Sequence, residues 1–159
     1  MDRRVVITGL GAVTPCGNSP EELWNSLMAG KHGFELAPWF PDQEPDNLSV
    51  VARVKNFDPS EYFDKKELRR NDVIVQYAVY CAMQALKDAG TDLKDIDPYR
   101  VGVVIGSGIG GIYTTEEEMQ NYHNKGNKRV GVFTITKMIG NMAAGEVAIR
   151  TGFKGSNFC

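Results

Sequence analysis

Apolar and polar residues follow one another in blocks along the chain, and the blocks predict strands that alternate with helices. Two β-branched runs bounded by glycines, at residues 5–8 and 101–105, predict buried strands, and a further strand is expected to begin at residue 157. Because uniformly apolar strands separated by helices are typical of parallel sheets covered on both faces, this order predicts an α/β fold with a mixed, mainly parallel sheet.

Helical periodicity is strongest over residues 72–89, where apolar side chains recur at i, i+3, i+4 and i+7 until Gly90. The apolar positions are Ile74, Tyr77, Ala78, Cys81, Ala82, Ala85 and Leu86. A shorter helix has Ser19 as its candidate N-cap, Glu22 as the partner in a capping box and Gly30 as its C-terminal cap.

Two more helices are expected in the second half of the chain. The first is polar and covers about residues 113–122, and the second covers residues 137–150 and is largely buried. Residues 31–60 contain four prolines, which argue against long elements, although residues 50–54 are a candidate short strand.

The amino-acid composition of the chain excludes several classes of protein. Hydrophobic residues make up 42% and charged residues 24% of the 159 residues, as in ordinary globular proteins. A net charge of −2 excludes a globally basic nucleic-acid-binding protein. No apolar run reaches the ~18 residues of a membrane span and no signal-peptide core is present, so we expect a cytoplasmic protein with no membrane span and no nucleic-acid partner.

The cysteines and histidines predict neither a metal site nor a nucleophile. Cys16, Cys81 and Cys159 form no C-x-x-C pair, and an odd number in a chain without a targeting segment predicts free thiols. Cys81 lies in the apolar stripe of its helix and is interpreted as a small buried hydrophobic residue. His32 and His123 have no suitable neighbours in the sequence and are interpreted as surface residues.

Residues 106–111 read Gly-Ser-Gly-Ile-Gly-Gly and formally satisfy the G-x-G-x-x-G pattern of dinucleotide-binding sites. The acidic residue that should follow about 20 residues later is missing, because no Asp or Glu occurs between Glu118 and Glu146. A dinucleotide-binding domain is therefore disfavoured, and we expect these glycines to allow turns to pack closely around a buried centre.

Two basic clusters, at residues 65–70 and at Lys128-Arg129, stand out in a net acidic chain. Such a cluster is either a solvated face or a landing site for an acidic partner, and the sequence pattern alone leaves both interpretations open.

Several segments together resemble the β-ketoacyl-acyl carrier protein synthases, also called 3-oxoacyl-ACP synthases. Residues 5–15 with Gly17-Asn18 resemble the N-terminal signature of that family, and residues 64–72, 103–111 and 141–142 resemble it in the same order. The turn that contains Ile109 is more similar to the type II synthases. The resemblance implies a thiolase-like fold of two similar halves, assembled as a homodimer, of which residues 1–159 form an incomplete first half.

The resemblance also implies an activity: decarboxylative Claisen condensation of malonyl-ACP with acyl-ACP in fatty acid biosynthesis. The family uses a cysteine at a helix N-terminus, two histidines and a lysine. The nucleophile follows a strand that opens after a turn matching residues 152–155, which places it a few residues beyond Cys159. We therefore expect a fragment that contains no catalytic residue and is inactive alone. A non-catalytic chain-length-determining partner is the alternative.

Binding roles are implied for eight residues. Ile109 matches the residue that gates the acyl pocket, and Phe133 to Met138 match a segment that extends toward the partner subunit's acyl pocket. Val132 and Thr136 stand where the family often has proline. The basic positions implied in docking an acidic acyl carrier protein are Lys66, Arg69, Arg70, Lys128 and Arg129. No cofactor is expected, since phosphopantetheine arrives on the carrier.

Overall fold

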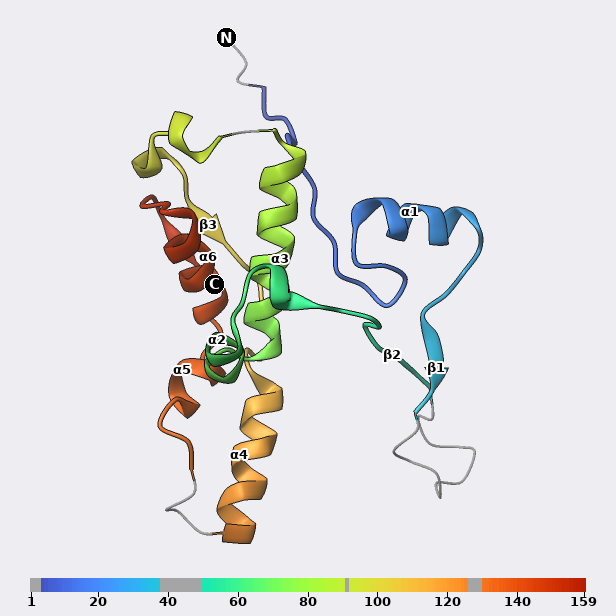
Figure 1. Ribbon diagram of the computed structural model, residues 1–159, viewed down its shortest axis with the longest axis vertical. Helices are drawn as coiled ribbons and strands as arrows, with labels where there is room; N and C mark the ends of the chain where they lie inside the picture. Colours follow the sequence, from blue (N-terminus) through green and yellow to red (C-terminus); the bar gives the residue numbers. More distant parts are fainter. Residues whose placement is uncertain (1–3, 38–49, 91, 126–129) are drawn as a thin grey trace.

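The computed structural model describes residues 4–37, 50–90, 92–125 and 130–159 (Figure 1). The long helix α3 (Val73–Asp88) forms the centre, and α6 (Met142–Thr151) packs against it. The strands β3 (Val103–Val104) and β4 (Asn157–Phe158) pair in parallel beside α6, with Val103 opposite Asn157. The predicted parallel pairing is thus confirmed.

Three further helices complete this body of the molecule. The glycine turn after β3 leads into α4 (Ile112–Lys125), and α5 (Thr134–Met138) packs against α4. The short helix α2 (Lys65–Arg70) follows the 3₁₀ turn η1 (Pro59–Glu61). Two more 3₁₀ turns connect α3 to β3, namely η2 (Leu93–Asp95) and η3 (Pro98–Arg100).

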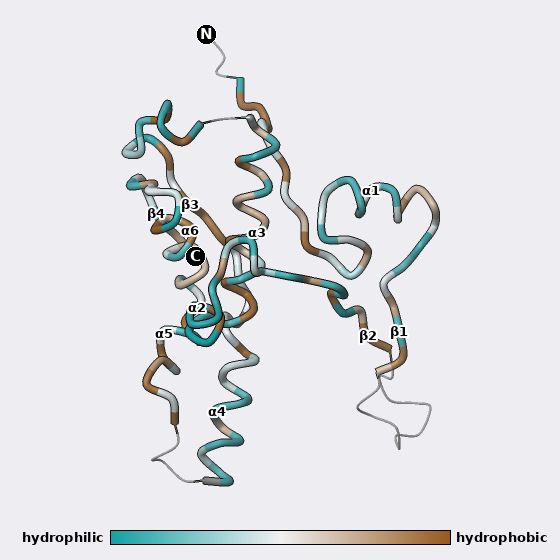
Figure 2. The backbone as a smooth tube through the Cα atoms, viewed as in Figure 1, coloured by the Kyte–Doolittle hydropathy of each residue, from teal (hydrophilic) through white to brown (hydrophobic). Residues whose placement is uncertain are grey.

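A second, smaller lobe stands apart from α3 (Figure 1). It contains α1 (Pro20–Met28) and an antiparallel pair formed by β1 (Phe34–Leu36) and β2 (Val50–Ala52). The first of these strands was not expected from the sequence, whereas β2 confirms the candidate strand near residue 50. Apolar residues at the β1–β2 pair and in residues 4–10 lie on the outside of the molecule (Figure 2).

The core lies where α3, α6 and β3 meet. Small and β-branched residues allow the two helices to approach closely, as packed interiors require. The buried members of the cluster are Phe63, Val75, Val79, Val103, Ala143, Ala144 and Val147. No helix in the described parts of the chain has the length and apolar character needed to cross a membrane.

The helix signals read from the sequence are largely confirmed. The Ser19 hydroxyl accepts from the Glu22 N–H at 3.1 Å, and Gly30 and Gly90 adopt φ of +64° and +63° after α1 and α3. The Glu22 carboxylate, however, accepts from the Asn18 N–H at 2.7 Å instead of from Ser19, so the predicted capping box is only half formed.

The predicted strand at residues 5–8 was wrong. Among the described residues this segment pairs with no strand, and it runs along α3 in an extended course. It is held there by side chains of α3: the Leu10 N–H donates to Asp88 at 2.9 Å and the Ala12 N–H donates to Gln84 at 2.8 Å. A Cβ atom at Gly11 would lie 2.0 Å from the Cys81 carbonyl oxygen, so the close approach requires glycine.

The predicted single helix over residues 137–150 was also wrong. It is divided into α5 and α6, because Ile139 is extended with ψ of 134°. The Gly111 N–H donates to the Met138 carbonyl at 2.9 Å, so a neighbouring turn occupies the carbonyl at which the helix would continue. The sheet covered on both faces is likewise not complete within the described residues, where the parallel sheet has two strands.

Candidate functional site

The basic helix α2 has a well-fixed beginning. Asp64 Oδ1 accepts from the N–H groups of Lys66 and Glu67 at 2.6 and 2.8 Å, and the Glu67 carboxylate accepts from the Asp64 N–H at 2.8 Å. This is a complete capping box. The two backbone hydrogen bonds, from Glu67 and then Lys66, lower the pKa of Asp64, and the charges of Arg70 and Arg150 add to the effect.

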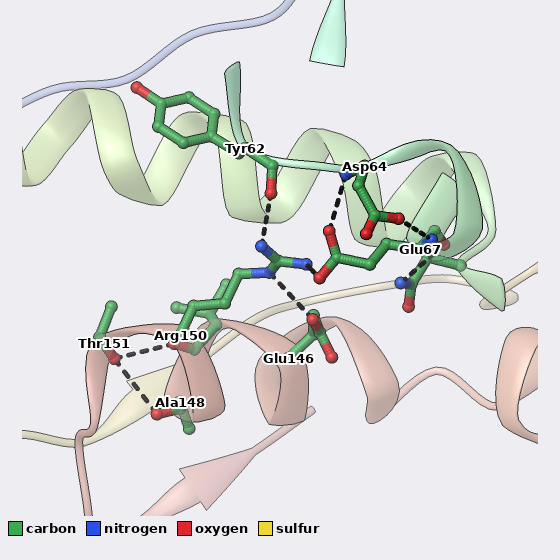
Figure 3. A network of polar contacts seen from close by, with 9 residues as sticks. Tyr62, Asp64, Glu67, Glu146, Ala148, Arg150 and Thr151 are labelled. Atoms are coloured by element: carbon green, nitrogen blue, oxygen red, sulfur yellow. Dashed lines mark hydrogen bonds and ion pairs between the residues drawn. The ribbon is translucent and has the colours of Figure 1, made fainter. Parts of the chain in front are cut away.

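Arg150 on α6 fastens α2 to the core (Figure 3). Its guanidinium donates to Glu67 at 2.8 Å, to Glu146 at 2.9 Å and to the Tyr62 carbonyl. Its Cζ also lies 4.2 Å from the centroid of the Phe63 ring. Since the planar guanidinium of a partly buried arginine holds each of its acceptors in a defined direction, α2 rests on a rigid base.

Three of the five predicted docking residues project from this base. Lys66, Arg69 and Arg70 are exposed on α2, and within the described residues neither Lys66 nor Arg69 forms an ion pair. Lys128 and Arg129 lie outside the described residues, so their predicted part in carrier docking stays a prediction. The structure therefore presents an exposed cationic face on α2, formed by Lys66, Arg69 and Arg70, which we call the α2 basic face.

The three residues predicted to form the acyl pocket lie on two neighbouring segments. Ile109 is 71% exposed in the glycine turn between β3 and α4, and Met138 ends α5. The bond from the Gly111 N–H to the Met138 carbonyl joins these two segments. Phe133 lies at the other end of α5, where the Arg70 Cζ is 5.0 Å from its ring centroid.

An apolar groove of about 390 Å³ runs between α4 and α5. The residues that line it are Thr115, Glu118, Met119, Tyr122, His123, Val130, Thr134 and Met138. Met138 is the one acyl-pocket residue among them. A groove of this shape suits an alkyl chain or an apolar surface of another subunit.

Two backbone N–H groups of the glycine turn are already hydrogen-bonded within the chain and are not free to bind a phosphate. The Gly110 N–H donates to the Ser107 hydroxyl at 2.9 Å and the Gly111 N–H to the Met138 carbonyl. At the start of α4 the Thr114 N–H and hydroxyl both donate to the buried Asp72 carboxylate, at 2.9 and 2.5 Å. A carboxylate at that helix terminus repels an anion, which argues further against dinucleotide binding. The pairing of Asp72 with Thr114 was not predicted from the sequence.

The three cysteines are free thiols. Burial raises the pKa of the half-buried Cys81 thiol, Cys16 is half-buried in a tight turn, and Cys159 is exposed. The rings next to the histidines are aromatic: Phe34 lies 5.7 Å from His32, and Tyr122 lies 6.0 Å from His123. No group of three or more metal-ligating side chains occurs within the described residues.

Comparison with known proteins assigns the family. Residues 2–159 match the model of the β-ketoacyl synthase N-terminal domain. The chain belongs to the β-ketoacyl synthase family. The 3-oxoacyl-[acyl-carrier-protein] synthase 2 of Staphylococcus aureus (strain N315) is 41% identical to this synthase segment over 156 residues, which are 98% of the chain and 37% of the relative. The chain thus spans little more than a third of the length of the curated relatives it matches.

Solved structures agree on the fold. A ketosynthase bound to the hexaketide and in complex with its type II PKS acyl-carrier protein superposes with a TM-score of 0.77, at 26% identity, over 98% of this segment and 42% of that chain. The ishigamide ketosynthase/chain length factor superposes with a TM-score of 0.84 at 22% identity, over 98% and 39%. The segment therefore has a partial ketosynthase fold of the thiolase-like, mixed helix-and-sheet class, as the sequence predicted.

Proposed function

We propose that this chain is the N-terminal part of a 3-oxoacyl-ACP synthase that elongates acyl chains in fatty acid biosynthesis. The reaction is the decarboxylative condensation of malonyl-ACP with acyl-ACP. The observation that carries this proposal is the 41% identity to a synthase of that type over 98% of the chain.

The α2 basic face is proposed to dock the carrier protein, together with Lys128 and Arg129. Acyl carrier proteins are acidic, so their carboxylates and the phosphopantetheine phosphate complement exposed lysines and arginines. The Arg150 network supports this role, because it holds α2 in place while leaving Lys66 and Arg69 unpaired among the described residues. The solved ketosynthase in complex with its own carrier protein supports the same class of partner.

Ile109, Phe133 and Met138 are proposed to contact the acyl chain. Ile109 is an exposed apolar side chain on a turn that is fastened to α5, which is a suitable place for a gate. The apolar groove between α4 and α5 supports an apolar partner at this end of the molecule. We expect a full-length synthase to be a cytoplasmic homodimer in which the segment from Phe133 to Met138 meets the partner's acyl pocket. No cofactor is proposed, since the phosphopantetheine comes with the carrier.

The chemistry itself is proposed to reside outside these 159 residues. A thiol nucleophile needs a lowered pKa, from a helix N-terminus or a paired histidine. Cys81 has the opposite shift, and the contacts of His32 and His123 in the described structure are with the rings of Phe34 and Tyr122. We infer that the catalytic cysteine, the two histidines and the lysine belong to the remainder of a full-length synthase, so that this chain alone does not condense.

Malonyl-dependent elongation of acyl-ACP tests the proposal. We expect the full-length synthase to form 3-oxoacyl-ACP, and the 159-residue chain to form none above a control without protein. Turnover by the 159-residue chain would overturn the proposed placement of the catalytic residues.

The second candidate is a non-catalytic chain-length-determining partner, which the fold similarity to a ketosynthase/chain length factor favours. Incubation of the full-length protein with acyl-ACP followed by mass spectrometry distinguishes the two functions. A synthase acquires a covalent acyl thioester on cysteine, whereas a silent partner acquires none and supports condensation only when a separate ketosynthase is added.

A further inference from the structure

The α2 basic face and the acyl-binding segment meet in one contact. The Arg70 Cζ lies 5.0 Å from the centroid of the Phe133 ring, inside the ~6 Å range in which a guanidinium is attracted to an aromatic face. Arg70 extends from α2, which Arg150 fixes to the core through Glu67. The ring of Phe133 therefore rests against a side chain whose helix is itself held in place.

Phe133 is the residue from which α5 starts. Its carbonyl accepts from the Lys137 N–H at 2.9 Å and from the Thr136 hydroxyl at 3.0 Å, so the position of Phe133 sets the first turn of the helix. Phe133 occupies the N-cap position and its side chain makes no capping hydrogen bond. The preceding turn has a separate attachment, since the Gly131 N–H donates to Glu118 of α4 at 2.9 Å. The ring contact with Arg70 attaches Phe133, at the end of the same turn, to α2.

The C-terminal end of α5 contacts the turn that carries Ile109, the proposed gate residue. The Met138 carbonyl accepts from the Gly111 N–H, two residues after Ile109. At this place a Cβ atom on Gly110 would lie 2.5 Å from the Met138 carbonyl oxygen, so the turn and the helix end are packed in direct backbone contact. A shift of α5 therefore moves the turn that carries Ile109.

We infer that Arg70 is a positioning residue for the acyl-binding segment, in addition to its part in carrier docking. Through the Phe133 ring it fixes α5, and through α5 it fixes the turn with Ile109. This inference rests on the proposed function for the roles of Phe133 and Ile109. It makes Arg70 different from Lys66 and Arg69, which project from the same helix and are proposed only to meet the carrier.

A substrate without a carrier protein distinguishes the positioning role of Arg70 from its role in carrier docking. The full-length synthase is acylated with decanoyl-N-acetylcysteamine, which has no protein to dock, and the acylation kcat/KM is measured by mass spectrometry. The variants are Arg70→Gln, Arg70→Lys and Phe133→Leu, with Arg70→Gln/Phe133→Leu as the double variant. Lys65→Gln is the matched control, because Lys65 is an exposed cation on the same helix and forms no ion pair within the described residues.

We expect Arg70→Gln to lower the carrier-free kcat/KM by about 2- to 5-fold, which corresponds to the loss of one cation–π contact. Arg70→Lys keeps a cation over the ring and should retain most of the rate, which also guards against misfolding of the Gln variant. In the Phe133→Leu background the Arg70→Gln change should cost nothing further. Equal carrier-free rates for Arg70→Gln and Lys65→Gln, or independent losses in the double variant, would overturn the inference.

Docking is judged separately, with decanoyl-ACP and the Arg69→Gln variant. If Arg69→Gln and the charge-reversed Lys66→Glu/Arg69→Glu variant both leave the rate with the carrier substrate unchanged at low salt, the proposed docking face fails. The positioning role of Arg70 is still decided by the carrier-free rates, so the two failures are distinguishable.

Discussion

The two sides of α3 are packed in different ways. On the side of α6 and β3, Val75 and Val79 are each 1% exposed and belong to a continuous core. On the other side the N-terminal segment lies along the helix with Val5 and Ile7 92% and 83% exposed. Both sides offer β-branched side chains, so burial here depends on a second element that covers them.

This difference indicates which side of α3 contributes most to the free energy of unfolding. The core side buries apolar surface, which is the main favourable contribution to folding. The N-terminal side is attached by hydrogen bonds from Leu10 and Ala12 to side chains of α3, and such bonds contribute little net free energy each. We therefore expect substitutions on the two sides to differ strongly in their effect on the free energy of unfolding.

The largest effect is expected at Asp72, where the core side joins α4. Its carboxylate accepts from Thr114 twice and from the Ile74 N–H at 3.2 Å. Asp72→Ala removes the N-cap of α3 and leaves two buried donors of Thr114 unpaired, which should lower the free energy of unfolding by about 2–4 kcal/mol. Urea denaturation of the 159-residue chain measures it.

Asp72→Asn is the control for that experiment, since an amide oxygen still caps the helix. It should cost clearly less than Asp72→Ala. A loss of under about 1 kcal/mol for Asp72→Ala would show that the junction of α3 and α4 contributes little.

Two valine-to-alanine substitutions, one on each side of α3, test the comparison of the two sides. Val79→Ala opens a cavity in the core and should lower the free energy of unfolding by about 2 kcal/mol, whereas Val6→Ala should change it by less than about 0.5 kcal/mol. The same urea titrations give both values. Similar losses for the two variants would contradict the division of α3 into a buried and an exposed side.

The same two regions show what the sequence could predict. The helices over Val73–Asp88 and Ile112–Lys125 and the parallel strand at Val103–Val104 follow from local periodicity and end signals. Residues 5–8 carry an equally strong strand pattern, but a strand forms only with a hydrogen-bonded neighbour. Of these two runs, only Val103–Val104 has such a neighbour within the described residues.

The site was predicted to a similar degree. The basic residues of α2 could be recognised as a cluster, and the family resemblance directed attention to Ile109, Phe133 and Met138. The contacts that position them were missed: Arg150 to Glu67 joins residues 83 positions apart, and Arg70 to Phe133 joins two segments with no shared pattern. Long-range pairs of this kind leave no periodic signal in one sequence. The capping box of Asp64 and Glu67 was the one signal that could have revealed α2 as a helix.

Arg150 should have an intermediate effect, because it joins the core side to α2. Its side chain is 19% exposed, and Arg150→Ala removes charge-assisted bonds to Glu67, Glu146 and the Tyr62 carbonyl. We expect a loss of about 1–2 kcal/mol in the free energy of unfolding, together with faster hydrogen exchange of the α2 amides. Arg150→Lys keeps the charge without the planar fork and should recover only part of the loss. Unchanged exchange in α2 would contradict the role of Arg150 as its anchor.

Cysteine labelling compares the environments of Cys81 and Cys159 without any substitution. Burial raises the pKa of the Cys81 thiol on α3, so less of its thiolate is present at a given pH than for an ordinary thiol, and access to it is restricted, whereas Cys159 is exposed. Iodoacetamide should therefore modify Cys159 first, and the Cys81 rate should continue to rise with pH above the ordinary thiol range of ~8.5. Mass spectrometry of labelled peptides gives the order, and equal rates near neutral pH would show that α3 does not shield Cys81.

The most direct test of the α2 basic face is carrier binding to the full-length synthase as a function of salt. The Lys66→Glu/Arg69→Glu variant is compared with wild type and with Lys94→Glu, an exposed lysine on η2. Surface charges each contribute about 0–1 kcal/mol and are screened over about 8 Å at physiological salt. We predict that the double variant binds acyl-ACP about tenfold more weakly at low salt, mainly through slower association, and that the difference shrinks at high salt. Equal low-salt affinities for all three proteins would contradict the account and leave α2 as a solvated face.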